Sequence, residues 1–210
     1  LKKGSTVIDM SSVKPETAKF HGENLKTKNV NYLDATVSGG TIGAEEATLA
    51  IMVGGDEKVF NDNLEVLKVM GNPTLVGPIT SGQVSKLANH IIVGLTIGAV
   101  SEAVTLCERA GADPAKMIKA VTGGWADSKI LQTHGQRMIK KDFTPKGKTS
   151  THLKDMNNIL GCAKNFDLHL PISTLVKDMY NNLVKNGHGN EDHSSLYKEL
   201  ERINKKWAID

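Results

Sequence analysis

The sequence of 210 residues contains no run of five basic residues, and its 26 Lys and Arg nearly balance its 23 Asp and Glu. A nucleic-acid-binding protein carries a concentrated basic patch, so no nucleic acid is expected as a partner. The longest apolar run, Ile91–Val100, is shorter than the roughly 20 residues that span a bilayer. Because no signal peptide is visible either, we expect a cytoplasmic protein with no membrane association.

Cysteine and the common catalytic spacings are also scarce. Only Cys107 and Cys162 occur, both in segments that look helical, which excludes a disulfide framework and favours a reducing compartment. No H-x-x-x-H or C-x-x-C spacing is present, so no metal site is expected. No nucleophile elbow appears, which leaves acyl transfer without support.

The first third of the chain alternates predicted strands with predicted helices. Such alternation is typical of an α/β layer with a largely parallel sheet. The expected strands cover residues 5–10, 31–35, 49–53 and 74–76, and the expected helices cover residues 15–28 and 56–70.

From Gly82 onward nearly every segment has helical periodicity. One helix is predicted from Gly82 to about Ala110, a length that usually bridges layers or domains. Further helices are expected from residue 114 to about 122 and over about 127–140, 149–167, 171–186 and 191–206. We therefore predict two domains: residues 1–79 as part of a dinucleotide-binding domain and residues 80–210 as an all-α domain for substrate binding and dimerisation.

The predicted sheet is small for a dinucleotide-binding domain, which normally has about six strands. The G-x-G-x-x-G turn that opens such a domain is missing, and Gly39-Gly40-x-x-Gly43 is a poor substitute because no helix is predicted there. We expect this chain to be the second half of a Rossmann-type domain followed by the all-α domain. We expect it to be inactive without the N-terminal half.

Two polar segments follow predicted strands, at the strand ends where ligands bind in open α/β sheets. Asp9-Met10-Ser11-Ser12 could hold a phosphate or ribose, or could simply cap the helix over residues 15–28. Asp34–Gly40 ends in Ser38-Gly39-Gly40, where backbone N–H groups could approach a bound carboxylate. The alternative for this second segment is a flexible loop.

Two lysines lie in helical segments with polar neighbours. Gln83, Lys86, Asn89 and His90 share one helix face beside the apolar stripe. Partial burial lowers the pKa of a lysine toward the range useful to a general acid or base, whereas a solvated lysine has no such role. Lys154 could neutralise a ligand charge or pair with Asp155.

Together, in this order and spacing, these segments resemble the β-hydroxyacid dehydrogenase family over essentially the whole chain. The matching residues are Asp9-Met10-Ser11-Ser12, Asp34–Gly40, Gly82-Gln83 with Lys86-Leu87-Ala88-Asn89, and Lys154-Asp155. The segments Gly123-Gly124, His134-Gly135 and Asp192-His193-Ser194 resemble the tartronate semialdehyde reductase branch most.

The resemblance implies an oxidoreductase that interconverts a short β-hydroxyacid and its semialdehyde with NAD or NADP. It assigns the acid/base role to Lys86 and the substrate carboxylate to Ser38, Gly39 and Gly40. It also assigns substrate orientation to Asn89 and His90, and cofactor contacts to Ser12 and Lys154. His90 departs from the family, which often has Asn or Gln at that position, and its charge changes near pH 6.5.

Several functional alternatives remain at this point. Reduction of tartronate semialdehyde to glycerate is favoured, with Trp125-Ala126-Asp127 as a polar loop suited to a hydroxylated substrate. A 3-hydroxyisobutyrate or other 3-hydroxyacid dehydrogenase is the alternative, and a non-catalytic binding or oligomerisation module is an alternative of another class. The apolar stripe of the long helix predicts a homo-oligomer, either a dimer or a tetramer.

Overall fold

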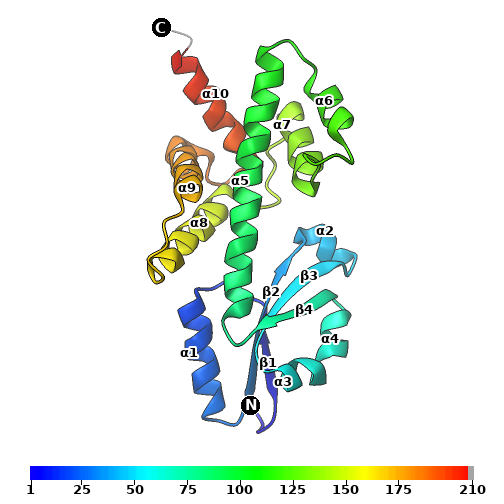
Figure 1. Cartoon of the computed structure of the whole chain (residues 1–210), viewed down its shortest axis with the longest axis vertical. Coiled ribbons are helices and arrows are strands. Elements are labelled where there is room, and N and C mark those ends of the chain that lie inside the picture. The colour runs from blue at the N-terminus through cyan, green and yellow to red at the C-terminus, as the bar shows by residue number, and fades with distance from the viewer. Residues whose placement is uncertain (208–210) are drawn as a thin grey trace. The chain divides into compact units, whose positions relative to one another are not determined.

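The computed structural model describes residues 1–207 and divides them into two compact units (Figure 1). The first unit is Leu1–Asn89, and the second begins at His90. The division falls inside one helix, α5 (Ser81–Arg109), which is continuous across it. The domain boundary between residues 79 and 80 stays a prediction.

The first unit is an α/β layer with the four expected strands. Its sheet has the order β1-β2-β3-β4. The strands are β1 (Thr6–Asp9), β2 (Asn31–Ser38), β3 (Leu49–Gly54) and β4 (Gly71–Gly77), and the helices are α1 (Pro15–Lys26), α2 (Gly40–Glu45), α3 (Glu57–Asp62) and α4 (Leu64–Lys68). The α/β part of the predicted fold class is confirmed.

One strand pair departs from the expected parallel sheet. β1 and β2 are parallel, as are β3 and β4, but β2 and β3 are antiparallel, with Ala35 opposite Val53. The segment between β2 and β3 contains only α2 and its flanking turns. Parallel neighbours need a crossover of about a dozen residues or more, so this short connection reverses the chain direction.

Two helical expectations in the first unit are also corrected. A helix, α2, does open at Gly40, because positive φ angles of 144° at Gly39 and 64° at Gly40 turn the chain directly from β2 into it. The helix predicted over residues 56–70 is two helices that meet at Asn63. The side-chain amide of Asn63 donates to the Val59 carbonyl at 2.8 Å and to the Thr6 hydroxyl at 3.3 Å, which competes with continued helix.

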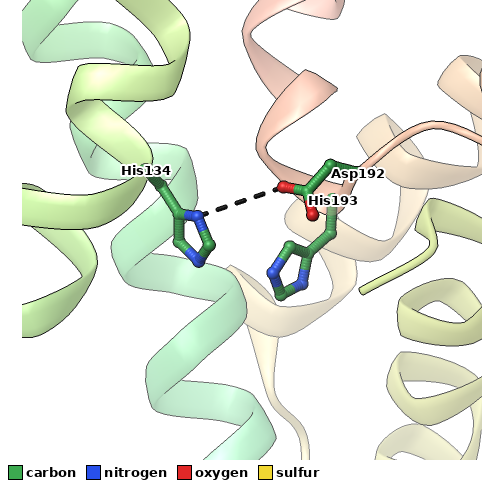
Figure 2. Close-up of side chains that lie close together, drawn as sticks. All are labelled: His134, Asp192 and His193. Carbon is green, nitrogen blue, oxygen red and sulfur yellow. Dashed lines mark ion pairs between the residues drawn. The ribbon is translucent and has the colours of Figure 1, made fainter. Parts of the chain in front are cut away.

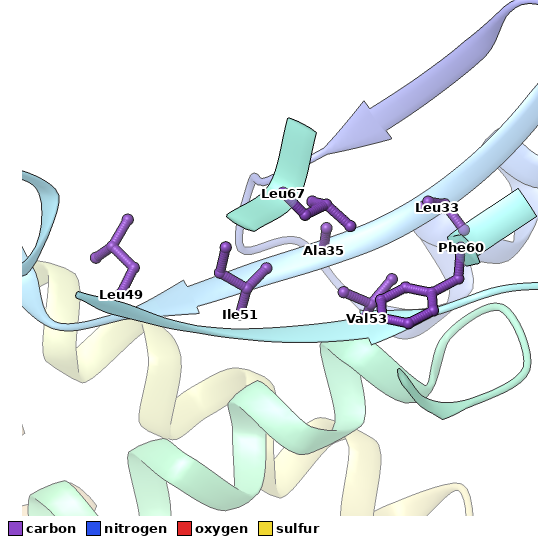
Figure 3. Packing of buried hydrophobic residues seen from close by; sticks show 7 residues of the cluster. All are labelled: Leu33, Ala35, Leu49, Ile51, Val53, Phe60 and Leu67. Atoms are coloured by element: carbon purple, nitrogen blue, oxygen red, sulfur yellow. The ribbon is translucent and has the colours of Figure 1, made fainter. Parts of the chain in front are cut away.

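Alternate residues of the two central strands form the core of the first unit (Figure 3). Their side chains point toward the covering helices, from which Phe60 and Leu67 pack against them. The core residues of the two strands are Leu33, Ala35, Leu49, Ile51 and Val53. The period of two places the intervening residues of β2, Asp34 and Thr36, on the opposite face.

The second unit is all-helical, as predicted. Besides its part of α5, it contains α6 (Pro114–Val121), α7 (Gln136–Lys140), α8 (Thr149–Lys164), α9 (Pro171–Leu183) and α10 (Leu196–Trp207). The helix predicted over residues 127–140 includes a π-helical turn over Leu131–Gly135. The helix predicted over residues 171–186 continues beyond Leu183 as a π-helical turn that contains Gly187 with φ 91°.

Among the described residues, α5 is the one helix long and apolar enough to cross a membrane by length and composition. Core helices of soluble proteins have the same length and composition. A single helix of this kind is therefore weak support for a membrane span.

Candidate active site

The loop after β1 is held in place at its start by Asp9. One carboxylate oxygen accepts the Ser11 N–H at 3.0 Å, and the other accepts the Tyr32 hydroxyl at 2.9 Å. Burial by itself would raise the pKa of Asp9, but these hydrogen bonds outweigh it and lower the pKa. An ionised Asp9 therefore anchors this loop, and Ser12 lies partly exposed within it.

Gln83, on the first turns of α5, holds the same loop from the other side. Its amide nitrogen donates to the Ser11 carbonyl at 2.8 Å, and its amide oxygen accepts the Val13 N–H at 3.0 Å. Gln83 is 1% exposed. Helical spacing groups Gln83 with Lys86 and Asn89 but does not reveal this function, although an amide next to the apolar stripe is a signal for a buried hydrogen-bonding role.

Asp34 of β2 joins the sheet to the start of α5. Its two carboxylate oxygens accept the Thr80 N–H at 2.9 Å and the Gln83 N–H at 2.8 Å, so it caps the helix from a distant strand. Thr80 has φ 87°, an unusual value for a β-branched residue, and the bond to Asp34 helps to hold it there. Burial raises the pKa of Asp34 despite these bonds.

A second contact fixes α5 to the same strand. The Thr36 hydroxyl donates to the Gly82 carbonyl at 2.8 Å, and both residues are buried. Asp34 and Thr36 therefore determine where the first turns of α5 lie. The next turn of the helix carries Lys86.

Lys86 lies against the end of β2. Its ammonium donates to the Val37 carbonyl at 2.6 Å and to the Asn89 side-chain oxygen at 3.5 Å, and the residue is partly buried. Val37 immediately precedes Ser38. The structure thus brings Lys86 and Asn89 to the start of the predicted carboxylate loop.

That loop is open to solvent. Ser38 ends β2 and is partly exposed, and Gly39 and Gly40 are exposed. A Cβ added to Gly40 would meet nothing within 4 Å, so this residue faces open space. Gly39 and Gly40 lead directly from β2 into α2, so the segment between this strand and the helix is short.

The remaining predicted site residues, His90 and Lys154, belong to the second unit, where they share one partner. Asp155 lies 3.3 Å from His90 Nδ1 and 2.9 Å from Lys154 Nζ. The Asp155 side chain is 7% exposed, whereas that of Lys154 is 51% exposed. Lys154 therefore forms the ion pair that the sequence left as an alternative, and half of its side chain still reaches solvent.

The loop expected to supply a polar contact to the substrate is held by its own bonds. Asp127 accepts the Gly123 N–H at 2.8 Å and the Gln132 amide at 2.7 Å, so both of its carboxylate oxygens bond within the loop region. Trp125 is fully exposed.

The second unit also contains a line of four histidines that the sequence pattern did not reveal. The ring centroids of His134 and His193 are 4.7 Å apart, those of His193 and His152 5.2 Å, and those of His152 and His90 5.8 Å. Burial, together with the charge of nearby His193, lowers the pKa of His134 to about 4. Burial lowers the pKa of His193 as well.

His134 and His193 lie beside Asp192 (Figure 2), and potential metal-binding atoms of the three residues lie within 4.8 Å of one another. The Asp192 oxygens, however, already accept bonds from Ser194, Lys146 and Gly147. The Arg137 guanidinium lies 3.7 Å from the same carboxylate. With its lone pairs occupied by protein donors and a fixed positive charge beside it, Asp192 is poorly suited to bind a cation.

Comparison with protein families matches both parts of the chain. The family described as "NAD-binding of NADP-dependent 3-hydroxyisobutyrate dehydrogenase" matches residues 80–200. The family described as the NAD binding domain of 6-phosphogluconate dehydrogenase matches residues 1–94.

Individual relatives agree with these matches. The chain is 46% identical to 2-hydroxy-3-oxopropionate reductase of Escherichia coli over 200 residues, which are 95% of this chain and 68% of that protein. It is 31% identical to the mitochondrial 3-hydroxyisobutyrate dehydrogenase of Drosophila melanogaster, over 96% of this chain and 65% of that protein. The crystal structure of a 3-hydroxyisobutyrate dehydrogenase from Salmonella typhimurium superposes with a TM-score of 0.87 at 28% identity, over 94% of this chain and 70% of that one. The chain therefore spans about two thirds of the length of these relatives.

Proposed function

This chain belongs to the NAD(P)-dependent hydroxyacid dehydrogenase family, and from that premise we propose that it interconverts a short β-hydroxyacid and its semialdehyde, with Lys86 as the acid/base group. The observation that carries the proposal is the position of the Lys86 ammonium, 2.6 Å from the Val37 carbonyl and next to the open Ser38-Gly39-Gly40 loop. Family membership supports the reaction class.

In the reducing direction, negative charge develops on the carbonyl oxygen of the aldehyde. An ammonium at the Lys86 position stabilises that charge and donates a proton to the oxygen as the alcohol forms. In the oxidising direction, the neutral amine takes the hydroxyl proton. Asn89, 3.5 Å from Lys86 Nζ, helps to hold this group in place and to orient the substrate oxygen.

The substrate carboxylate is assigned to Ser38, Gly39 and Gly40. A serine hydroxyl and two backbone N–H groups are suitable donors to a carboxylate, and the absence of side chains on the glycines allows close approach. Gly40 faces open space, which leaves room for a bound ligand.

The nicotinamide cofactor, NAD or NADP, would supply or accept the hydride. On this chain, the residues assigned to it are Ser12, in the loop after β1, and Lys154. The loop fits that assignment, because it lies at the carboxyl end of a strand and its backbone is fixed by Asp9 and Gln83. The half-exposed Lys154 ammonium can meet an anionic group while Asp155 holds its position.

For the substrate we favour 2-hydroxy-3-oxopropionate, the semialdehyde of tartronate, which is reduced to glycerate. The greater identity to the E. coli reductase than to the Drosophila 3-hydroxyisobutyrate dehydrogenase supports this choice. The second candidate is a 3-hydroxyacid such as 3-hydroxyisobutyrate, which has a methyl group where glycerate has its 2-hydroxyl. Relative kcat/KM values for the two substrates, measured with the full-length protein, decide between them.

The acid/base role is tested by Lys86→Ala in the full-length protein, with Lys68→Ala as the matched control. Lys68 is an exposed lysine of the same unit, paired with Glu65 at 2.9 Å. We expect kcat to fall at least about 100-fold for Lys86→Ala with cofactor binding retained, and to stay unchanged for Lys68→Ala. An unchanged rate in Lys86→Ala would exclude Lys86 as the acid/base group, whereas absence of turnover in the wild-type protein would favour a non-catalytic module.

We further propose that the protein is cytoplasmic and self-associates through apolar surface of the second unit. Phe166, Leu168, Ile172 and Leu175, at the junction of α8 and α9, are each more than half exposed. Exposed apolar residues of this size near one another are typical of interfaces. Light scattering at micromolar concentration is expected to show a dimer or tetramer, and a monomer would contradict the proposal.

A further inference from the structure

We propose that Gln83 is a positioning residue. It holds the loop after β1, whose Ser12 is assigned to the cofactor, in a fixed position relative to α5, the helix that carries Lys86. The proposal rests on the function proposed above. It assigns to Gln83 no contact with substrate or cofactor. Its role is to hold Ser11–Val13, the stretch that contains Ser12.

The side chain of Gln83 bonds on both sides of Ser12. Its amide nitrogen donates to the carbonyl of Ser11, and its amide oxygen accepts the N–H of Val13, at 2.8 and 3.0 Å. A single planar amide thus replaces the two hydrogen bonds that a neighbouring strand would make to this stretch. At 1% exposure, Gln83 leaves little room for water to take over these bonds if its side chain is lost.

The backbone of Gln83 is held separately. Its N–H donates to Asp34, which also accepts the Thr80 N–H, and the preceding residue Gly82 accepts from Thr36. Substitution of the Gln83 side chain leaves all of these bonds possible. The place of α5 and the place of the β1 loop are therefore set by different atoms of the same residue.

Few other side chains can substitute for this amide. The geometry requires a donor and an acceptor on the same terminal carbon, at the reach of two methylenes. Methionine has a similar length and neither strong group. An ionised glutamate has acceptors only, whereas a protonated glutamate again offers one O–H donor and one carbonyl acceptor.

The experiment compares Gln83→Met and Gln83→Glu with the matched control Gln132→Met in the full-length protein. Gln132 is a partly buried glutamine of the second unit whose amide bonds Thr122 and Asp127. Four quantities are measured: hydrogen exchange at the Val13 amide without cofactor, the Kd for NADH and NADPH, and kcat and the substrate KM at saturating cofactor.

For Gln83→Met we expect exchange at Val13 to accelerate at least about tenfold, because its hydrogen bond is lost. The Kd of the preferred cofactor should rise at least about tenfold, while kcat at saturating cofactor and the substrate KM stay within about threefold of wild type. For Gln83→Glu, the loss in affinity should shrink as the pH falls and the carboxyl becomes protonated. Gln132→Met should change neither Val13 exchange nor the cofactor Kd.

Different results overturn different parts of the argument. Unchanged Val13 exchange in Gln83→Met would show that Gln83 does not hold the loop. Faster exchange with an unchanged Kd would show that the loop's position does not matter for the cofactor. A wild-type protein that binds neither nucleotide would refute the proposed function and with it the positioning role toward the cofactor. In that case Val13 exchange would still report whether the Gln83 side chain holds the loop after β1.

Discussion

In the first unit, the buried polar side chains Asp34, Thr36 and Gln83 lie where strand ends meet α5, on the face of β2 opposite the apolar core. In the second unit, buried polar groups such as Asp192, His152 and Thr149 lie among the core helices themselves. The first set bonds to backbone at the start of α5 and in the loop after β1, close in sequence to the residues proposed to contact ligands. The second set connects loops to helices far from each other in the sequence.

This difference predicts different consequences of substitution. Buried polar groups in the first unit position the proposed catalytic and binding residues, so their loss should change kinetic constants before it unfolds the unit. Asp192 in the second unit bonds the backbone at Lys146, Gly147 and Ser194, so its loss should lower the free energy of unfolding of that unit. Hydrogen exchange read separately over β2 and α8 distinguishes the two outcomes.

The largest expected effect is that of Asp192→Asn. Burial alone would raise the pKa of Asp192, but hydrogen bonds from Ser194, Gly147 and Lys146 lower it to about 2, so the native state contains the carboxylate. An amide places N–H groups against N–H donors and leaves Arg137 with only the more exposed Asp142 as a counter-ion. We expect the free energy of unfolding to fall by roughly 3–5 kcal/mol.

Chemical denaturation, monitored by hydrogen exchange at the amides of α8, measures this loss. The control is Asp113→Asn at the exposed N-terminus of α6, where asparagine caps as well as aspartate and almost no change is expected. Equal small effects in both variants would contradict the view that buried polar groups hold the second unit together.

Acid should destabilise the second unit through its histidines. Burial lowers the pKa of His134 in the folded protein to about 4, from about 6.5 for an unperturbed histidine. Between these values the unfolded chain binds a proton that the folded chain does not. The stabilisation is therefore complete above about pH 6.5 and falls by about 3 kcal/mol as the pH drops to about 4.

Stability measured from pH 7 to pH 4 tests this prediction. His134→Gln should flatten the curve, because the titrating group is gone. His169→Gln, at an exposed histidine, should leave the curve as it is. A steep curve in His134→Gln would assign the acid sensitivity to other groups.

A smaller effect is expected from Gly82→Ala in α5. A methyl group at Gly82 would collide with the Asp34 carbonyl oxygen and lie 2.6 Å from the Met52 carbonyl oxygen, so the helix start must move away from β2. We expect a loss of about 2 kcal/mol in the first unit, with reduced kcat because Lys86 moves with the helix.

The same helix offers the matched control Gly98→Ala. There the added methyl group meets Val176 at 3.7 Å and Leu196 at 3.9 Å, both ordinary contacts. The variant should be neutral or stabilising by up to about 1 kcal/mol, because alanine favours helix over glycine. Thermal unfolding of the two variants, with kcat measured in the same samples, makes the comparison.

Local sequence pattern predicted most of the fold, because helices and strands depend mainly on residues that are close together in the sequence. Alternation of strand-like and helical segments marked the first unit, and helical periodicity marked α5 and the helices after it. The pattern failed at Gly40, where a helix opens, and at Asn63, where one breaks. Both depend on backbone angles or side-chain bonds that periodicity does not contain.

The candidate site divides in the same way. Lys86 and Asn89 are three residues apart, so helical spacing alone places them on one face of α5. The residues of the proposed carboxylate loop are consecutive in the sequence. The assignment of roles came from the resemblance, and those roles stay predictions. Asp34 and Gln83 were missed as supports because their partners are 46 to 72 residues away along the chain.

The sequence by itself determined an α/β layer followed by helices and the family to which the chain belongs, because residue types and spacings carry both. Only the tertiary structure decided the reversed direction of β3 and the contact of Lys86 with Val37. It also decided the hydrogen bonds of Gln83 to the loop after β1 and the grouping of the four histidines near Asp192. Each of these depends on atoms that chain folding brings together across long sequence separations. Tertiary folding decides whether a buried amide or carboxylate meets its hydrogen-bond partner, and composition and periodicity do not encode that contact.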